Sequence, residues 1–190
     1  MSGDDRIRAG LRSLAQAAEA ATGLAPQVAA LAERYIAVLG GGGTLYFAGN
    51  GGSAADAQHL ATEYVVRFRQ ARRPLSAVAL TTDTSLLTAA GNDLGFEQIF
   101  ARQVEAHCRP GDLLILHSTS GASANLLAAA RAARARGVPV AAFLGGDGGA
   151  LRALADVAIV VPSDDTSRIQ ELQLALEHLI VEAVEEALGT

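Results

Sequence analysis

The spacing of apolar residues along the chain changes once, near residue 40. Before that point, apolar side chains recur every three or four residues in two groups, which are separated by a break at residues 23–26. The groups are Ile7, Leu11, Leu14 and Ala18, then Val28, Leu31, Tyr35 and Val38. This spacing is that of one helical face, so residues 1–39 are predicted to form two helices.

After the glycines at 40–43, the chain carries short apolar runs, mostly separated by helical segments. The runs occupy residues 44–49, 75–82, 112–119, 139–146 and 157–163. Near-continuous apolar strands that alternate with helices predict a parallel sheet covered on both faces. We therefore expect a single domain over residues 1–190: a three-layer α/β/α, doubly wound, five-stranded parallel sheet of flavodoxin-like order, with residues 1–39 as a helical N-terminal extension.

Composition narrows the class of protein. The chain has 190 residues, of which 50% are hydrophobic and 18% charged, as in a globular domain. A net charge of -5 disfavours nucleic-acid binding, and the arginines at 67, 69, 72 and 73 are interpreted as a solvated helix end. One cysteine excludes an intrachain disulfide, and we see no signal peptide or membrane-spanning segment, so no membrane partner and a cytoplasmic location are expected.

Two loops rich in small residues follow the first and third predicted strands. They read "GNGGS" (49–53) and "STSGAS" (118–123), and they should meet where the winding of the sheet reverses, which is where such folds bind ligands. Hydroxyls before a helix N-terminus suit a phosphate, although helix capping is the simpler role for any one of them. The pattern Gly49, Gly51, Ala54 also resembles a dinucleotide fingerprint, but the acidic residue Asp83 lies too far along the chain for that site.

Two helices carry candidate chemistry: the one that follows the loop at 49–53 and the last one, at 166–188. His59 and Glu63 lie one turn apart on one face, which suits two metal ligands, a base with its partner, or an ordinary surface pair. The last helix has one core stripe, at Ile169, Leu172, Leu176 and Leu179, and a second at Leu174, Val181 and Leu188. The second stripe predicts packing on a partner chain and hence oligomerisation. His107 and His117 are expected to be structural.

Four separated segments together resemble the sugar isomerase (SIS) domain and, within it, the phosphoheptose isomerases. They are "GNGGSAADAQHLATEY", "TTDTSLLTAAGNDLGFEQIFARQVEA", "STSGASAN" and "RIQELQLALEH". The resemblance implies the conversion of sedoheptulose 7-phosphate to D-glycero-D-manno-heptose 7-phosphate, an early step toward bacterial surface heptose and lipopolysaccharide. It also implies a cytoplasmic homotetramer that binds zinc.

The same resemblance implies roles for individual residues. Zinc ligands would be His59, Glu63, Gln170 and His178. Substrate contacts would come from Asn50, Gly51, Gly52, Ser53, Glu63, Asn92, Asp93, Ser118, Thr119, Ser120, Ser123 and Gln170. Two positions depart from the family pattern: Gln173 stands where many members have a histidine, and Ala122 where an asparagine is common.

Isomerisation of an aldose and a ketose moves a proton between neighbouring carbons through an enediol, and it needs proton carriers and a stabiliser of the oxyanion. All fifteen basic residues are arginine, so a Schiff-base lysine is excluded. We expect Glu63 and His178 to carry the protons.

Gln170 and His178 are eight residues apart, which predicts a metal site shared between subunits. The alternatives are a non-catalytic SIS regulator that binds a replication initiator protein, and an isomerase of another phosphosugar.

Overall fold

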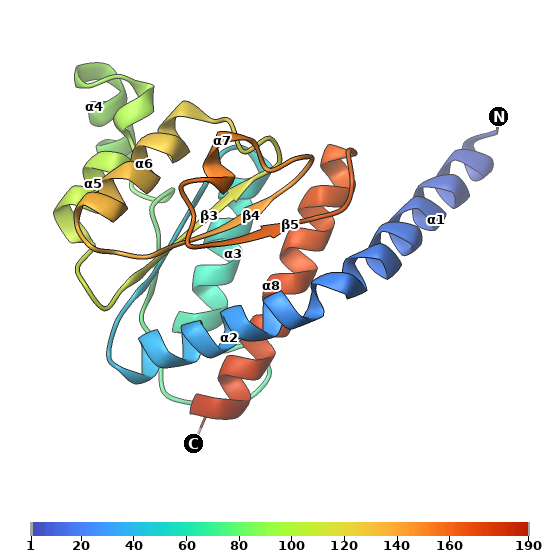
Figure 1. Cartoon of the computed structure of the whole chain (residues 1–190), viewed down its shortest axis with the longest axis horizontal. Coiled ribbons are helices and arrows are strands. Elements are labelled where there is room, and N and C mark those ends of the chain that lie inside the picture. The colour runs from blue at the N-terminus through green and yellow to red at the C-terminus, as the bar shows by residue number, and fades with distance from the viewer. Residues whose placement is uncertain (1, 190) are drawn as a thin grey trace.

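The computed structural model describes residues 2–189, which form one sheet flanked by helices (Figure 1). The strands are β1 (Leu45–Gly49), β2 (Ala77–Ala79), β3 (Leu113–Ser118), β4 (Val140–Leu144) and β5 (Val157–Val160). The α-helices are α1 (Gly3–Ala21), α2 (Ala25–Gly40), α3 (Gly52–Val65), α4 (Thr84–Asp93), α5 (Ala101–His107), α6 (Ala124–Ala135), α7 (Gly149–Arg152) and α8 (Thr166–Leu188). The 3-10 turns are η1 (Thr22–Leu24) and η2 (Phe96–Gln98).

All five strands are parallel, in the order β2-β1-β3-β4-β5. Each strand lies within one of the predicted apolar runs, and the predicted fold class is confirmed. The order reverses between β1 and β3, because the chain leaves β1 for the edge strand β2 and then returns to the other side of β1. The carboxyl ends of β1 and β3 therefore border the crevice where such sheets bind ligands.

Alternate residues of each strand enter two hydrophobic cores, one on each face of the sheet. Phe47 and Ile115 join the core with α2, α3 and α8. Ala48 and Leu116 join the core with α5 and α6 on the opposite face. Burial on both faces explains why the strand sequences are continuously apolar instead of alternating.

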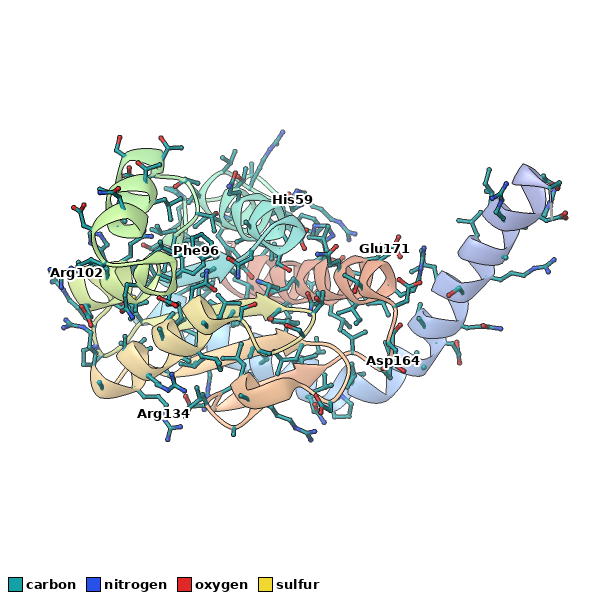
Figure 2. All side chains as sticks on the ribbon, turned by 90° about the horizontal axis from the view of Figure 1, so that it is seen from above. His59, Phe96, Arg102, Arg134, Asp164 and Glu171 are labelled. Atoms are coloured by element: carbon teal, nitrogen blue, oxygen red, sulfur yellow. The ribbon has the colours of Figure 1, made fainter. Side chains whose placement is uncertain are left out.

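The first helix projects beyond the body of the molecule, as the views in Figure 1 and Figure 2 both show. A capping box starts it, in which Ser2 and Asp5 exchange hydrogen bonds with each other's backbone. Ile7 and Leu11 on its apolar stripe are 66% and 63% exposed. The stripe therefore has no complete partner within the described residues. None of the helices in residues 2–189 is long and apolar enough to cross a membrane.

The prediction for the second stripe of α8 is wrong. Val181 is fully buried in the core, and Leu174 and Leu188 pack against that core. The open apolar surface lies on another face, where α8 borders α1 and α2 around a groove of about 490 Å³. Leu179, which was assigned to the core stripe, is 57% exposed along this groove. Because α8 packs against the sheet, α2 and α3, it has apolar residues on several sides. The spacing of its apolar residues therefore does not show which face is exposed.

The prediction of a fully solvated arginine cluster is also wrong for one member. Arg72 has a side chain that is only 1% exposed and that pairs with the buried Glu185 of α8. Arg69 is exposed, as expected. The loop after α3, residues 66–76, is therefore anchored to the body of the molecule.

Candidate active site

The two loops after β1 and β3 meet at the predicted edge of the sheet and enclose a small polar cavity of about 90 Å³. Gly51 has φ 57°, a left-handed conformation that lets the chain turn sharply from β1 into α3. The cavity is lined by Asn50, Ser53, His117, Ser118, Thr119, Ser120, Ser123 and Gln170. Seven of these eight residues were predicted from the sequence as substrate contacts.

Backbone and hydroxyl groups of the β3–α6 loop are arranged around this cavity. Ser118 Oγ accepts a hydrogen bond from Gly121 N at 3.0 Å, and Ser120 Oγ accepts one from Ala122 N at 3.3 Å. Ser123 is the N-cap of α6, but its side chain makes no capping hydrogen bond. Its hydroxyl and the free N–H groups of the helix therefore remain available to an anion.

An amide pair holds the two loops together. Asn50 Nδ2 donates to Asn125 Oδ1 at 2.9 Å, and Asn125 Nδ2 donates back to Asn50 Oδ1 at 2.8 Å. Asn125 is 2% exposed. The pair fixes the relative position of the loops, so the structure gives Asn50 a scaffolding contact in addition to its place on the cavity wall.

Gly52, at the start of α3, lies close to the side chain of Gln170, near the start of α8. A Cβ atom on Gly52 would lie 2.7 Å from Gln170 Nε2, closer than such atoms approach in proteins. A side chain at residue 52 would displace Gln170. Glycine at residue 52 therefore leaves the Gln170 amide in its present position on the cavity wall.

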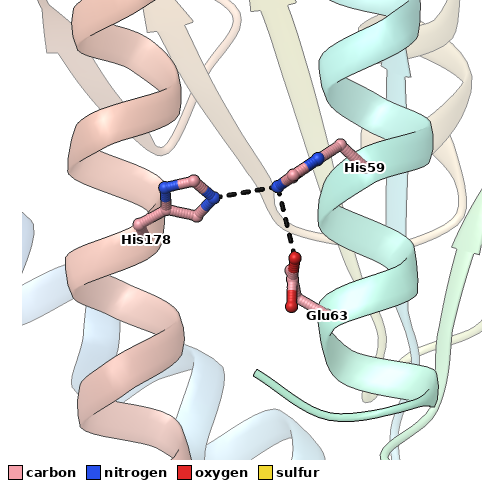
Figure 3. A group of neighbouring side chains, drawn as sticks. All are labelled: His59, Glu63 and His178. Atoms are coloured by element: carbon pink, nitrogen blue, oxygen red, sulfur yellow. Dashed lines mark hydrogen bonds and ion pairs between the residues drawn. The ribbon is translucent and has the colours of Figure 1, made fainter. Parts of the chain in front are cut away.

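His59, Glu63 and His178 converge farther along the same two helices (Figure 3). His59 Nε2 lies 2.9 Å from His178 Nε2 and 3.2 Å from Glu63 Oε1. One donor atom from each residue lies within 4.8 Å of the others. All three belong to one chain, so His178 joins His59 and Glu63 without a second subunit, while a Gln170 contributed by another chain stays a prediction.

The surroundings of His178 favour a neutral imidazole. Burial and the adjacent His59 lower the pKa of His178 below its ordinary value, against the opposing effect of the Glu63 and Glu177 carboxylates. The Phe68 ring stacks on the same imidazole with centroids 5.3 Å apart. A neutral histidine can accept a proton or bind a metal ion at neutral pH.

The geometry of this triad fits a metal ion. Two imidazole nitrogens about 2.0–2.1 Å from one tetrahedral ion lie about 3.3 Å apart, only slightly more than the 2.9 Å seen here. Histidine and carboxylate ligands suit zinc among other metals. Gln170, the fourth expected ligand, lies about two turns before His178, where it lines the cavity and lies close to Gly52.

A buried polar group that the sequence did not reveal lies behind the triad and the cavity. Tyr35 OH donates to Glu177 Oε1 at 3.0 Å, and His117 Nε2 lies 3.3 Å from the same oxygen. Glu177, His117 and Gln173 are fully buried. Glu177, a charged residue within an apolar stretch of α8, was the one signal of this group in the sequence. Its partners His117 and Tyr35 are 60 and 142 residues away, so they could not be predicted from it.

The structure does not bring every predicted contact to the cavity. Asn92 and Asp93 lie at the exposed end of α4, where Asn92 Nδ2 donates to Asp93 Oδ1 at 2.7 Å. Figure 1 places α4 far from α8. These two residues do not line the cavity of their own chain.

Known proteins resemble this chain over most of its length. Residues 10–145 match the model of the SIS domain. The chain is 53% identical to a phosphoheptose isomerase of Roseiflexus sp. over 86% of this chain and 83% of that protein, and 49% identical to one of Rhodospirillum rubrum over 97% and 98%.

Solved structures show the same relationship. The phosphoheptose isomerase of Neisseria gonorrhoeae superposes with a TM-score of 0.93 at 41% identity, covering 97% of this chain and all of that one. The enzyme of Francisella tularensis gives 0.95 at 36% identity, covering 98% and all of that chain. The chain therefore belongs to the SIS domain family and, within it, to the phosphoheptose isomerases.

Proposed function

We propose that the chain isomerises sedoheptulose 7-phosphate to D-glycero-D-manno-heptose 7-phosphate, with the phosphate in the serine-lined cavity and the reacting carbons at the triad. The cavity offers hydroxyls and a helix N-terminus to a dianion. The triad offers a carboxylate and a neutral imidazole within 4.8 Å of each other.

The spacing of the two sites matches the length of the substrate. Gly52 and His59 are separated by about 10 Å along α3, and Gln170 and His178 by about 12 Å along α8, at 1.5 Å per residue. With C–C bonds of about 1.5 Å, an open seven-carbon chain with its terminal phosphate extends to about 10 Å. A phosphate held in the cavity therefore puts C1 and C2 near His59, Glu63 and His178. This separation of sites is the observation that carries the proposal.

Glu63 and His178 are the proton carriers in this scheme. One removes a proton from C1 of the open-chain ketose while the carbonyl oxygen at C2 gains a proton, which gives the enediol. A proton then returns to C2 as the hydroxyl at C1 loses its own, which gives the aldose. The Asn50–Asn125 pair keeps the phosphate loop at a fixed distance from these carriers.

His59, Glu63 and His178 would hold a zinc ion, with Gln170 reaching it only if both α8 side chains extended toward each other. When bound, the ion supplies Lewis-acid stabilisation of negative charge on the sugar oxygens. His59 is the most exposed of the three residues.

Assembly of several chains completes the site. Asn92 and Asp93 lie away from the cavity of their own chain, so we assign their substrate contacts to a second copy of the chain. The open groove between α1, α2 and α8 supports a homotetramer, because its lining is almost wholly apolar.

The test is product formation by the Glu63→Gln variant. Purified protein is incubated with sedoheptulose 7-phosphate, and the heptose product is followed by NMR. Loss of a general base predicts a fall in turnover of about 10²-fold or more. Glu105→Gln, which changes an exposed glutamate on α5, should leave turnover unchanged. Near-normal turnover in Glu63→Gln would remove Glu63 from the mechanism, and no heptose product from the wild-type protein would point to another phosphosugar as the substrate.

A further inference from the structure

The loop after α3 lies against the triad through a single aromatic side chain. Phe68 stacks on the His178 imidazole with an angle of 23° between the rings. The Arg69 guanidinium lies 5.0 Å from the centre of the Phe68 ring, and Arg69 also pairs with Glu182. The position of Phe68 therefore limits how the His178 ring can rotate.

One buried carboxylate holds the backbone of this loop. Glu185 accepts hydrogen bonds from the N–H groups of Phe68, Arg69 and Gln70 at 3.0, 2.7 and 2.9 Å. Three consecutive amides directed at one anion define the loop conformation closely. His178 and Glu185 are seven residues apart on α8 and so lie on the same face of the helix. The helix that carries His178 thus also carries the residue that fixes Phe68 against it.

Arg72 connects the same carboxylate to the helix that carries Glu63. Its Nε lies 3.2 Å from Glu185 Oε1. Its terminal nitrogens donate to the Glu63 and Tyr64 carbonyl oxygens at 2.6 and 2.8 Å. These carbonyls are among the last of α3, which the helix itself cannot satisfy. Arg72 and Glu185 are 1% and 2% exposed, so the pair is shielded from solvent.

We propose that Glu185 and Arg72 are positioning residues for the triad: they hold Phe68 flat against His178 so that Nε2 faces His59 and Glu63. Neither side chain contacts a triad side chain, although Arg72 donates to the Glu63 backbone carbonyl. The effect of both residues on His178 passes through the loop backbone and the Phe68 ring. This inference rests on the role of His178 given above. The 66–76 loop is thereby part of the site although it supplies no ligand.

Two substitutions test the roles of Glu185 and Phe68 separately. Glu185→Gln replaces the carboxylate with an amide, whose nitrogen cannot accept from the loop, and Phe68→Leu removes the stacked ring while leaving the buried pair intact. Each variant should bind zinc about tenfold more weakly and lower kcat by a similar factor, as loss of the supports around a metal ligand does. KM should stay within about twofold, because the phosphate cavity lies about two helical turns away.

A double-mutant cycle and NMR of the metal-free protein distinguish positioning of His178 by Glu185 and Phe68 from a general effect of these residues on folding. If Glu185 acts through Phe68, the double variant binds zinc no more weakly than the weaker single variant. The His178 ring protons should lose the ring-current shift from Phe68 in Phe68→Leu and move in the same direction in Glu185→Gln. Glu186→Gln, an exposed neighbour on α8, is the matched control and should behave as wild type.

The outcomes distinguish this inference from the proposed function. Normal zinc affinity and kcat in Phe68→Leu would overturn the inference even if Glu185→Gln were impaired, because Glu185 would then act on the fold alone. Fully additive losses in the double variant would also overturn it. Normal zinc affinity and turnover in His178→Gln would instead overturn the role of His178 on which the inference rests.

Discussion

At the scale of single residues, the sequence predicted most side chains that line the cavity and form the triad, but not the buried polar residues behind them. His59 and Glu63 are one helical turn apart, so their proximity could be predicted. Glu177 and His117 come from elements distant in sequence, and only the packing of α8 on the sheet brings them to 3.3 Å. Burial of such a group is costly unless its polar atoms are paired.

The Tyr35–Glu177 hydrogen bond should therefore contribute measurably to stability. Tyr35→Phe removes the donor and should lower the free energy of unfolding by about 1.5–3 kcal/mol, the usual range for a hydrogen bond to a charged group. Tyr46→Phe is the matched control, since its hydroxyl makes only a 3.4 Å contact with the His107 carbonyl oxygen. Chemical denaturation of both variants measures the difference. An equal fall in the free energy of unfolding in both variants would mean that the Tyr35–Glu177 hydrogen bond contributes no more than the weak contact of Tyr46.

At the scale of elements, the prediction from sequence succeeded for elements whose residues all lie in the same kind of surroundings. The strands are buried on both faces, and their apolar runs located them to within a few residues. The bounds of α8 also agree with the expected segment, because a polar run precedes it and Gly189 follows it. Its surface assignment failed because the helix packs against several elements, so the open groove lies along Leu179 and not along Val181.

This correction moves the predicted subunit contact to another face of α8. Leu179→Lys places a charge in the apolar groove and should dissociate the assembly, while Val78→Lys on the edge strand β2 should not, because lysine is tolerated on sheet edges. Sedimentation measures the mass, with wild type expected at four 19.4-kDa chains. A Leu179→Lys protein that keeps the wild-type mass would place the interface elsewhere.

At the scale of the whole molecule, the doubly wound sheet forms the cavity proposed for the phosphate, and α3 and α8 carry the triad proposed for the chemistry. The reversal of strand order between β1 and β3 creates the small polar cavity, and α3 and α8 run from its wall to the triad. The sequence predicted the residues at each end. The distance between them, which relates the site to a seven-carbon substrate, required the packing of α3 against α8.

The central claim is that binding and chemistry are divided between these two places, and steady-state kinetics of two variants test it most directly. Ser120→Ala removes one hydroxyl from the cavity and should raise KM about tenfold or more with kcat nearly unchanged, because a hydrogen bond to a charged group contributes about 1.5–3 kcal/mol. His178→Gln should lower kcat by about 10²-fold or more with KM little changed. The opposite pattern, or a loss of kcat in both variants with KM unchanged, would contradict the division of the site.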